Sequence, residues 1–541
     1  MLWLLILLLS MGVCLLVASP GRVLFLSAAI SRIFKCLLFL SPMLYDYLVL
    51  LWFMRGLLGD ERMQALVAYH IRWAHRPRDL CLEMGGTYVK LGQVIASLKW
   101  VEIFPRPYLT ELRTLHSDFK PKPIHVVRDI IEQELGRTMG ELFDSFGDTI
   151  GSASIGQVHS AILHDGSPAV VKIQYPDLEK NMRVDCVTII SLLRCMSTLG
   201  LLAPSDVKLV SDAAQTLLDE TNFVHEAANL RRANEAVAPH FESVLIPRPF
   251  DAMHPQYAGR VLVSRKVLIM DKCPGRTLAA IGEDLLTIYA TLKGRSKDDI
   301  VAEAFNPEFT TEVPSLVNIQ TGVLAQTMMA AEFICNSTLG YVIPQTTLQL
   351  SAIPEVSSLI CEAFGHIIFR SGFVSNDPHA GNILIDLKTR QVSLIDMGGL
   401  VEFPTEQDRL RFAQFLIAVD DRDASGVRSY YDYIGNDFRL RSKPEERNPK
   451  DMCLITALPA FGGPQGNLDG LRMIACRNFK DVVAYNTQHN LREQHSKWFV
   501  EYFRMAISLG DVGLQLGMPR GIASMLRPSA ERYLKERNKL M

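Results

Sequence analysis

The sequence predicts an α+β chain with a two-lobed fold, preceded by a helical extension and an apolar N-terminal segment. Three observations support this fold class. From Phe143 apolar and polar residues alternate around glycine-containing turns, as they do in strands. After Pro176 the apolar residues recur at helical spacing. Three motifs with charged or amide side chains, AVVKIQ, NDPHAGN and LIDMGG, occur in that order along the chain.

A chain of 541 residues is too long for a single hydrophobic core, so several structural units are expected. Periodicity and composition divide it into four parts. Residues 1–56 form a membrane-associated segment, residues 57–142 a helical extension, residues 143–275 the first lobe and residues 276–541 the second lobe. The second lobe includes an insertion at about 293–353, where the composition is mixed and contains no readable motif.

The N-terminal segment is the most apolar part of the chain. No residue is charged from Met1 to Gly21, and the run is close to the roughly 20 residues that cross a bilayer. A cleaved signal peptide is the alternative, but no basic residue precedes the run and Pro20 lies beside the candidate cleavage site VAS. We therefore favour a membrane anchor. A second apolar stretch contains Pro42 and Asp46, and whether it lies in the interface or forms a hairpin stays open.

Overall charge and cysteine content exclude some classes of function. Lys and Arg number 56 against 58 Asp and Glu, so no net positive field attracts nucleic acid, and we expect no nucleic-acid partner. The ten cysteines include no CxxC pair and no Cys/His cluster at metal-ligand spacing. This pattern argues against a zinc site and against a disulfide framework.

The first candidate functional residue is Lys172, at the end of the strand-like run AVVKIQ. In protein kinases a strand lysine pairs with the nucleotide phosphates, and a turn of small residues lets backbone N–H groups approach them. Taken alone, a strand lysine is more often simply solvated. Here a turn of small residues lies one hairpin earlier, and it contains Gly151, Ser152, Ala153, Ser154 and Gly156.

Two later motifs supply oxygen ligands. Asp377 in NDPHAGN is followed five positions later by Asn382, which is the spacing of the kinase catalytic loop. Asp396 in LIDMGG stands where a kinase aspartate binds Mg²⁺. Either motif alone is well explained as an Asx turn. Three motifs in kinase order favour a site for ATP or ADP with Mg²⁺, with Asp377 catalytic and with Asn382 and Asp396 on the metal.

A kinase-like lysine also needs a carboxylate on a neighbouring helix to orient it. Glu226 in FVHEAANLRR is the favoured candidate, and Glu220, one and a half turns earlier, is its rival. Most helix glutamates point into solvent, so sequence alone leaves this choice open.

Six segments, YVKLGQ, SASIGQVH, AVVKIQYP, ETNFVHEAAN, NDPHAGN and LIDMG, together resemble the UbiB (aarF-domain, ADCK-type) family of atypical kinases. The resemblance spans roughly Gly85 to Leu400. Members of this family support ubiquinone synthesis and mitochondrial or plastid lipid balance. The resemblance implies a kinase-like fold, a mitochondrial membrane location, and isoprenoid lipid precursors and lipid-biosynthesis proteins as partners.

The resemblance also implies a regulatory segment. In the family a KxGQ helix, here including Lys90 and Gln93, folds over the active site and blocks the place of a peptide substrate. Lys90 is expected to meet acidic residues of the motif that begins here at Glu220. Asn222 stands where the family usually has aspartate, which puts the latch or metal role of that position in doubt.

These features predict a membrane-associated atypical kinase or ATPase that binds Mg-ATP and supports ubiquinone or isoprenoid-lipid metabolism. A nucleotide-binding pseudokinase scaffold without turnover is the alternative, because of Asn222. A peptide-directed protein kinase is the least favoured, because the KLGQ segment that includes Lys90 is intact.

Overall fold

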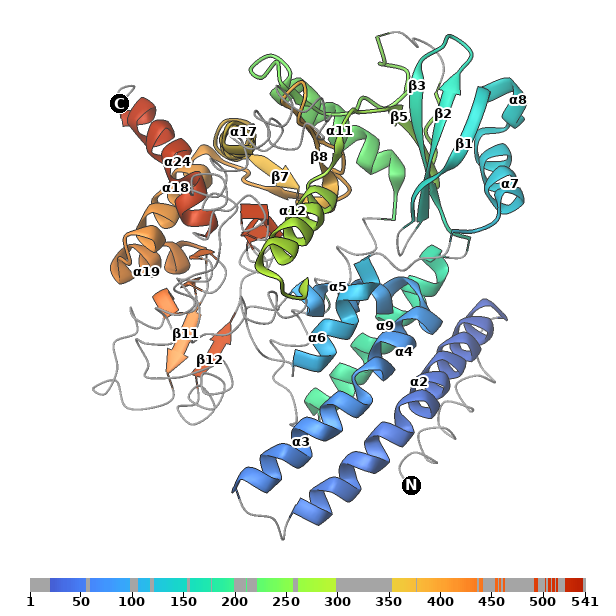
Figure 1. Cartoon of the computed structure of the whole chain (residues 1–541), viewed down its shortest axis with the longest axis vertical. Helices are drawn as coiled ribbons and strands as arrows, with labels where there is room; N and C mark the ends of the chain where they lie inside the picture. The colour runs from blue at the N-terminus through green and yellow to red at the C-terminus, as the bar shows by residue number, and fades with distance from the viewer. Residues whose placement is uncertain are drawn as a thin grey trace. The chain divides into compact units, whose positions relative to one another are not determined.

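Figure 1 shows the computed structural model of the chain. The described residues are 20–54, 59–97, 106–116, 121–152, 156–176, 178–198, 211, 221–255, 261–297, 353–375, 377–434, 437–440, 491–494, 521–538 and short pieces within 453–462 and 502–513. The apolar run before Pro20 and most of the predicted insertion lie outside them, as do three predicted site residues, Ala153, Ser154 and Glu220.

The chain separates into two compact units, each made of three stretches of sequence. The first unit contains Met1–Ile130, Thr149–Val158 and Ile173–Thr221, and the second contains Ile131–Asp148, His159–Lys172 and Asn222–Met541. The helices of the first unit are α2 (Pro20–Phe53), α3 (Gly59–Trp73), α4 (His75–Met84), α5 (Gly86–Ser97), α6 (Arg106–Arg113), the short η3 (Thr114–His116) and α9 (Leu178–Thr198).

Helix α2 is continuous over 34 residues and runs through Pro42. Of the two arrangements that the sequence left open for the second apolar stretch, the hairpin is therefore wrong. Proline lacks the N–H that would bond the carbonyl of Leu38, four residues earlier. The Ser41 hydroxyl donates a hydrogen bond to that carbonyl at 2.9 Å, so the freed acceptor is satisfied and the helix continues.

One face of α2 is held by the rest of the first unit through polar contacts. The Arg32 guanidinium donates to both carboxylate oxygens of Asp185 in α9, at 2.5 and 2.8 Å. The Trp73 indole N–H of α3 donates to Asp46 at 2.6 Å, and Figure 1 shows α2 and α3 side by side. The Asp185 side chain is only 1% exposed, so Arg32 neutralises a buried charge.

The strands form two four-stranded sheets and two pairs. One sheet has the order β1 (Phe143–Ser152), β2 (Gly156–Leu163), β3 (Pro168–Gln174) and β5 (Val267–Asp271). The other has the order β4 (Val244–Leu245), β9 (Gln391–Leu394), β8 (Ile383–Asp386) and β6 (Arg276–Thr277). The pairs are β7 (Phe373–Ser375) with β10 (Leu400–Glu402) and β11 (Asp437–Leu440) with β12 (Leu491–Gln494).

The hairpin β8–β9 brings the second and third motifs together. Its antiparallel register pairs Ile383 with Leu394, so the residue before β8 and the residues after β9 lie at the same end. The Ile395 N–H donates to the Asn382 carbonyl at 3.0 Å, which extends the ladder by one step. Asn382 and Asp396 therefore flank one end of the hairpin.

The second unit is rich in helices. They are α8 (Met139–Leu142), α11 (Phe223–Val237), α12 (Leu278–Lys293), α17 (Ile353–His366), α18 (Glu406–Asp420), α19 (Ala424–Tyr433) and α24 (Ile522–Asn538), with short turns η5 (Ile367–Ser371) and η6 (Ala380–Asn382). Helix α7 (Ile124–Leu135) begins in the first unit and ends in the second. Phe369, Phe412 and Tyr533 are buried where η5, α18 and α24 meet, and they form an aromatic cluster in the core of this unit.

Candidate functional site

Lys172 and Glu226 form a buried ion pair. Lys172 lies on β3, and its Nζ donates to Glu226 Oε1 at 2.5 Å. Glu226 lies in the first turn of α11, and its side chain is only 3% exposed. The Asn222 side chain caps this helix by accepting from the Val224 N–H at 3.1 Å. The structure places Glu226 on Lys172, and the rival candidate Glu220 lies outside the described residues.

Asp396 completes the contact set around Lys172. Its Oδ2 lies 3.2 Å from Lys172 Nζ, and its Oδ1 accepts from the Gly398 N–H at 2.9 Å. The second contact is an Asx turn, which fixes the carboxylate relative to the LIDMGG loop. The structure therefore joins the first and third motifs directly, although the two residues are 224 positions apart in sequence.

The electrostatics of this cluster keep Lys172 charged. Burial disfavours the charged ammonium, but the carboxylates of Asp396 and Glu226 favour it more strongly, and they raise the pKa of Lys172 above its ordinary value. The Phe223 ring centroid lies 5.5 Å from Nζ and adds a cation–π contact. A fixed positive charge beside a partly exposed carboxylate suits a site that binds phosphate and a cation together.

Asp377 and Asn382 belong to one compact loop. The Asn382 amide nitrogen donates to the Asp377 carbonyl at 3.3 Å, and Ser508 donates to Asp377 Oδ1 at 3.1 Å. His379 Nδ1 accepts from the Gly381 N–H at 3.0 Å, so this histidine shapes the turn. These contacts hold the side chains of Asp377 and Asn382 in place before any ligand binds.

The oxygen atoms near the hairpin end fit a magnesium ion bound with a nucleotide. Among the described residues no group of three or more His, Cys, Asp and Glu side chains is placed to hold a metal by itself. Mg²⁺ bound with a nucleotide is usually held by one or two protein oxygens, and phosphates and water supply the rest. The side chains of Asn382 and Asp396 provide two such oxygens.

Of the predicted turn, Gly151, Ser152 and Gly156 are described. A Cβ at Gly156 would lie 2.1 Å from the Ile173 carbonyl oxygen, so the close approach of β2 and β3 requires glycine there. A Cβ at Gly151 would meet no atom within 4 Å. The Ser152 hydroxyl lies 2.8 Å from the Tyr175 hydroxyl. Whether these residues contact a nucleotide stays a prediction.

The KLGQ residues pack within the first unit. Gln93 donates its side-chain N–H to the Leu115 carbonyl at 2.8 Å. A Cβ at Gly92 would lie 2.4 Å from a methyl carbon of Leu115, so this glycine lets α5 approach η3 closely. Lys90 is half-buried on the same helix. The structure thus gives Gly92 and Gln93 packing roles, and the regulatory role of Lys90 and Gln93 stays a prediction.

Two functional contacts were not found from the sequence. Ser508, which bonds Asp377, lies in a segment without a motif, so no sequence signal indicates it. Asn229 on α11 donates to the Met397 carbonyl at 2.8 Å and ties that helix to the LIDMGG loop. An asparagine inside a helical pattern does not indicate from sequence which group it bonds. The tertiary structure identifies the Met397 carbonyl as its partner.

These contacts join Glu226 and the Asp396 motif to Lys172, and the β8–β9 hairpin places Asn382 at the same end as Asp396. The sequence model of the ABC1 atypical kinase-like domain family matches residues 114–284 and 298–431. The chain belongs to this family. The resemblance to the UbiB (aarF-domain) family that was seen in the motifs is thereby confirmed.

Curated relatives of the chain carry names of the same family. AarF domain-containing protein kinase 1 of Mus musculus is 25% identical over 407 residues, which cover 74% of this chain and 61% of the relative. The Gallus gallus protein of that name is 26% identical over 423 residues, which cover 76% of this chain and 64% of the relative. Protein ACTIVITY OF BC1 COMPLEX KINASE 7, chloroplastic, of Arabidopsis thaliana is 24% identical over 65% of this chain and 40% of its own length.

The chain spans 61% to 66% of the length of the first four curated relatives it matches. A solved Mycobacterium tuberculosis structure with bound erythromycin is 19% identical, with a TM-score of 0.44 over 84% of this chain and 93% of that one. A TM-score this low adds nothing to the fold assignment. The kinase-like α+β domain is supported by the family match instead.

Proposed function

We propose that this chain is a membrane-associated atypical kinase or ATPase that binds Mg-ATP or Mg-ADP and acts in ubiquinone or isoprenoid-lipid metabolism. The main support is the contact set of Lys172 with Glu226 and Asp396. It combines a charged lysine, an orienting helix carboxylate and a second carboxylate at the end of a hairpin. Phosphoryl transfer requires these groups for positioning and electrostatic stabilisation.

Each residue has a distinct role in this proposal. Lys172 binds the α and β phosphates, and Glu226 holds the ammonium towards them. Asn382 and Asp396 hold Mg²⁺, which would neutralise the charge that develops on the transferred phosphoryl group. Asp377, restrained by Ser508, accepts or orients the proton of the attacking hydroxyl or water. The proposed two-lobed arrangement would place these groups between the lobes.

Helix α2 supports the membrane part of the proposal. Its window Ile30–Leu50 is long enough and apolar enough to cross a bilayer, with a mean hydropathy of 1.6 and none of it buried. The exposed large side chains on α2 include Phe34, Leu38, Tyr45 and Trp52, which recur at helical spacing. They lie opposite the face that contains Arg32 and Asp46, so the apolar face is free to contact lipid.

A lipid role is supported by the family alone. Members of the UbiB family support ubiquinone synthesis, and the Arabidopsis thaliana relative is named for activity of the BC1 complex. On this basis the partners are isoprenoid lipid precursors and lipid-biosynthesis proteins at a mitochondrial membrane. Nucleotide hydrolysis at the bilayer surface would supply the free energy that makes a bound isoprenoid lipid accessible.

Nucleotide binding is tested by thermal shift on the full chain in detergent, with ATP or ADP added with and without Mg²⁺. A ligand at a hundred times its Kd stabilises the folded state by about 2.7 kcal/mol. We expect the wild type to gain several degrees, and Lys172→Ala and Asp396→Asn to gain far less. Lys266→Ala is the matched control, because Lys266 pairs with Glu134 at an exposed site. Equal nucleotide responses in all four proteins would refute the proposed site.

A pseudokinase scaffold is the second candidate function, and Asn222 is the observation that favours it. Asparagine carries no charge, whereas the family usually has an aspartate at this position. The side-chain oxygen of Asn222 instead caps α11. Phosphate release with and without liposomes separates the two functions. Release that requires Lys172 supports turnover, and negligible release in both conditions supports the scaffold. A rise in peptide phosphorylation in Lys90→Ala would instead indicate a peptide-directed kinase that the KLGQ helix restrains.

A further inference from the structure

A cavity of about 330 Å³ lies among α18, α19 and α24, in the second unit. None of its lining residues belongs to the Lys172 contact set. Its walls are mainly apolar and include Phe415, Ile417, Ala418 and Leu534. Cavities of this size lie near the lower limit for small-molecule sites, so a small ligand fits and a nucleotide does not.

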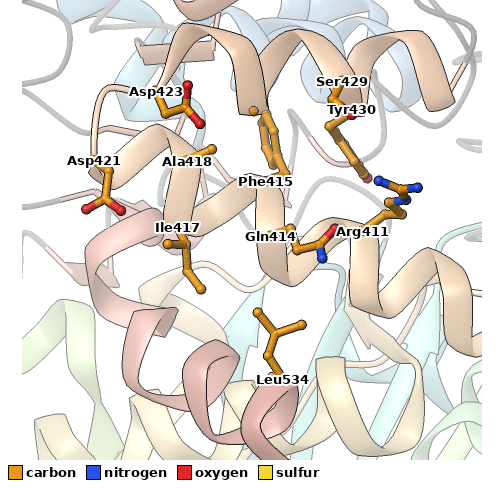
Figure 2. Close-up of a pocket in the computed structure, with 11 residues that line it drawn as sticks. Arg411, Gln414, Phe415, Ile417, Ala418, Asp421, Asp423, Ser429, Tyr430 and Leu534 are labelled. Carbon is orange, nitrogen blue, oxygen red and sulfur yellow. The ribbon is translucent and has the colours of Figure 1, made fainter. Parts of the chain in front are cut away.

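Polar side chains line one end of this cavity, and Arg411 is the cation among them. The Arg411 Nε makes no hydrogen bond to the described residues, and the guanidinium carbon lies 5.7 Å from the centroid of the Tyr433 ring. Ser429 and Tyr430 also line the cavity, and Figure 2 shows the Tyr430 ring directed towards Arg411. A half-exposed guanidinium beside an apolar wall can bind an anionic head group.

The phenol of Tyr430 is a donor at any physiological pH. Burial, with smaller effects from Tyr502 and Asp408, raises the pKa of Tyr430 well above its ordinary value. The hydroxyl therefore keeps its proton and can donate to an anionic ligand beside Arg411. A guanidinium and a phenol that lie side by side can both donate hydrogen bonds to the two oxygens of one carboxylate.

The nearby carboxylates are already engaged. Asp408 accepts from Thr405 and from the Tyr433 hydroxyl, so it does not pair with Arg411. At the opposite end Asp421 pairs with Arg527, and Asp423 caps α19. Figure 2 shows these two aspartates away from Arg411. Their negative charge disfavours a doubly charged phosphate and is compatible with a singly charged head group.

We propose that this cavity binds a medium-chain carboxylate, with the carboxylate on Arg411 and Tyr430 and the alkyl chain against Phe415, Ile417 and Leu534. The Arg411 guanidinium can form two parallel hydrogen bonds to the carboxylate. The alkyl chain replaces water along the apolar wall. This site is independent of the proposed nucleotide site.

The test uses octanoate, which is monomeric at millimolar concentration, and ligand-observed NMR on the full chain. We expect submillimolar binding that Arg411→Gln weakens by roughly tenfold to a hundredfold, the range for hydrogen bonds to a charged group. Ser429→Trp should block the cavity sterically. Arg532→Gln is the matched control, since Arg532 lies on α24, outside the lining, and is 60% exposed. Melting curves and the nucleotide response should be unchanged in all three variants.

Two comparison ligands separate the outcomes. Octanol has the same chain without the charge, and inorganic phosphate has charge without the chain. If octanoate and octanol bind equally well to wild type and Arg411→Gln, or if octanoate does not bind the wild type, the proposal is wrong. Complete displacement of octanoate by inorganic phosphate would show a site for a free anion and would also refute it.

Discussion

Lys172 is stable in its buried position because two carboxylates surround it, so removal of the lysine alone leaves unpaired negative charge. We expect Lys172→Met to reduce the free energy of unfolding by roughly 3 to 5 kcal/mol, the typical loss when one partner of a buried pair is removed. The double variant Lys172→Met with Glu226→Leu should recover much of this loss, because it replaces the pair with apolar side chains. Urea unfolding of both variants measures the difference. A double variant less stable than the single one would contradict this account.

His366 provides a pH-dependent contribution to stability. Burial, the neighbouring His240 and Arg370 lower its pKa below the usual 6.5, although a hydrogen bond to the Ala236 carbonyl opposes the shift. Below about pH 6.5 the unfolded chain therefore takes up a proton that the folded chain does not, and stability is lost as the pH falls. We expect His366→Gln to show a smaller loss between pH 7.5 and 5.5. The exposed His164→Gln is the control, and an unchanged slope in His366→Gln would contradict the assignment.

Sequence motifs predicted Lys172, Asp377, Asn382 and Asp396 as site residues, because magnesium and phosphate accept few residue types and the kinase order restricts their positions. The structure brings Asp396 of this set into contact with Lys172. The contact of Glu226 with Lys172 needed the structure, since the sequence offered Glu220 as a rival on the same helical pattern. Ser508 could not be found from sequence. Its contact with Asp377 spans 131 residues and depends on packing that no local pattern records.

At the scale of elements, two glycines offer a direct comparison: Gly151 lies near the end of β1, and Gly156 begins β2. A side chain at Gly156 would collide with a backbone oxygen, whereas one at Gly151 would project into open space. We expect Gly156→Ala to destabilise the chain by about 1 to 3 kcal/mol, the usual cost of overpacking. Gly151→Ala should be close to neutral. Thermal unfolding compares them, and equal melting temperatures would show that the β2–β3 approach is not tight.

The exposed face of α2 predicts how the chain engages lipid. We expect Phe34→Ser, Leu38→Ser and Trp52→Ser together to reduce flotation of the full chain with liposomes to the level that the apolar run of residues 1–21 supports alone. Each buried apolar side chain is worth about 1.5 to 3 kcal/mol. Met253→Ser is the control, because Met253 is 72% exposed on another element. Undiminished flotation of the triple variant would remove α2 from the membrane contact.

Sequence rules did not show whether the second apolar stretch forms one continuous helix, as it does in α2. Proline and aspartate inside an apolar run usually indicate a break. The hydroxyl of Ser41 and the indole of Trp73 satisfy the groups that would otherwise end the helix. The serine is adjacent in sequence and could have been noticed, whereas the tryptophan is a tertiary partner. The strands and the turn before Lys172 were predictable, because alternation and glycine placement are local.

For the whole molecule, each compact unit draws on three separated stretches of the chain. Composition and periodicity follow the order of the sequence, so they cannot reveal units that are assembled in this way. The family match, by contrast, depends on motif order and could be anticipated from the six segments. Long separations between contacting residues also imply slow folding, because loop closure precedes the stabilising contacts.

The ion pair of Arg32 with Asp185 has a consequence for synthesis on the ribosome. The two residues are 153 positions apart, and at roughly 5 to 20 residues per second Asp185 is added about 8 to 30 s after Arg32. During that interval Arg32 lacks Asp185, and the exposed apolar side chains on the other face of α2 are uncovered. A nascent chain in this state exposes the apolar side chains of α2 before Asp377, Asn382 and Asp396 have been translated. The order of the sequence thus lets lipid or a chaperone contact α2 before the proposed nucleotide site is complete.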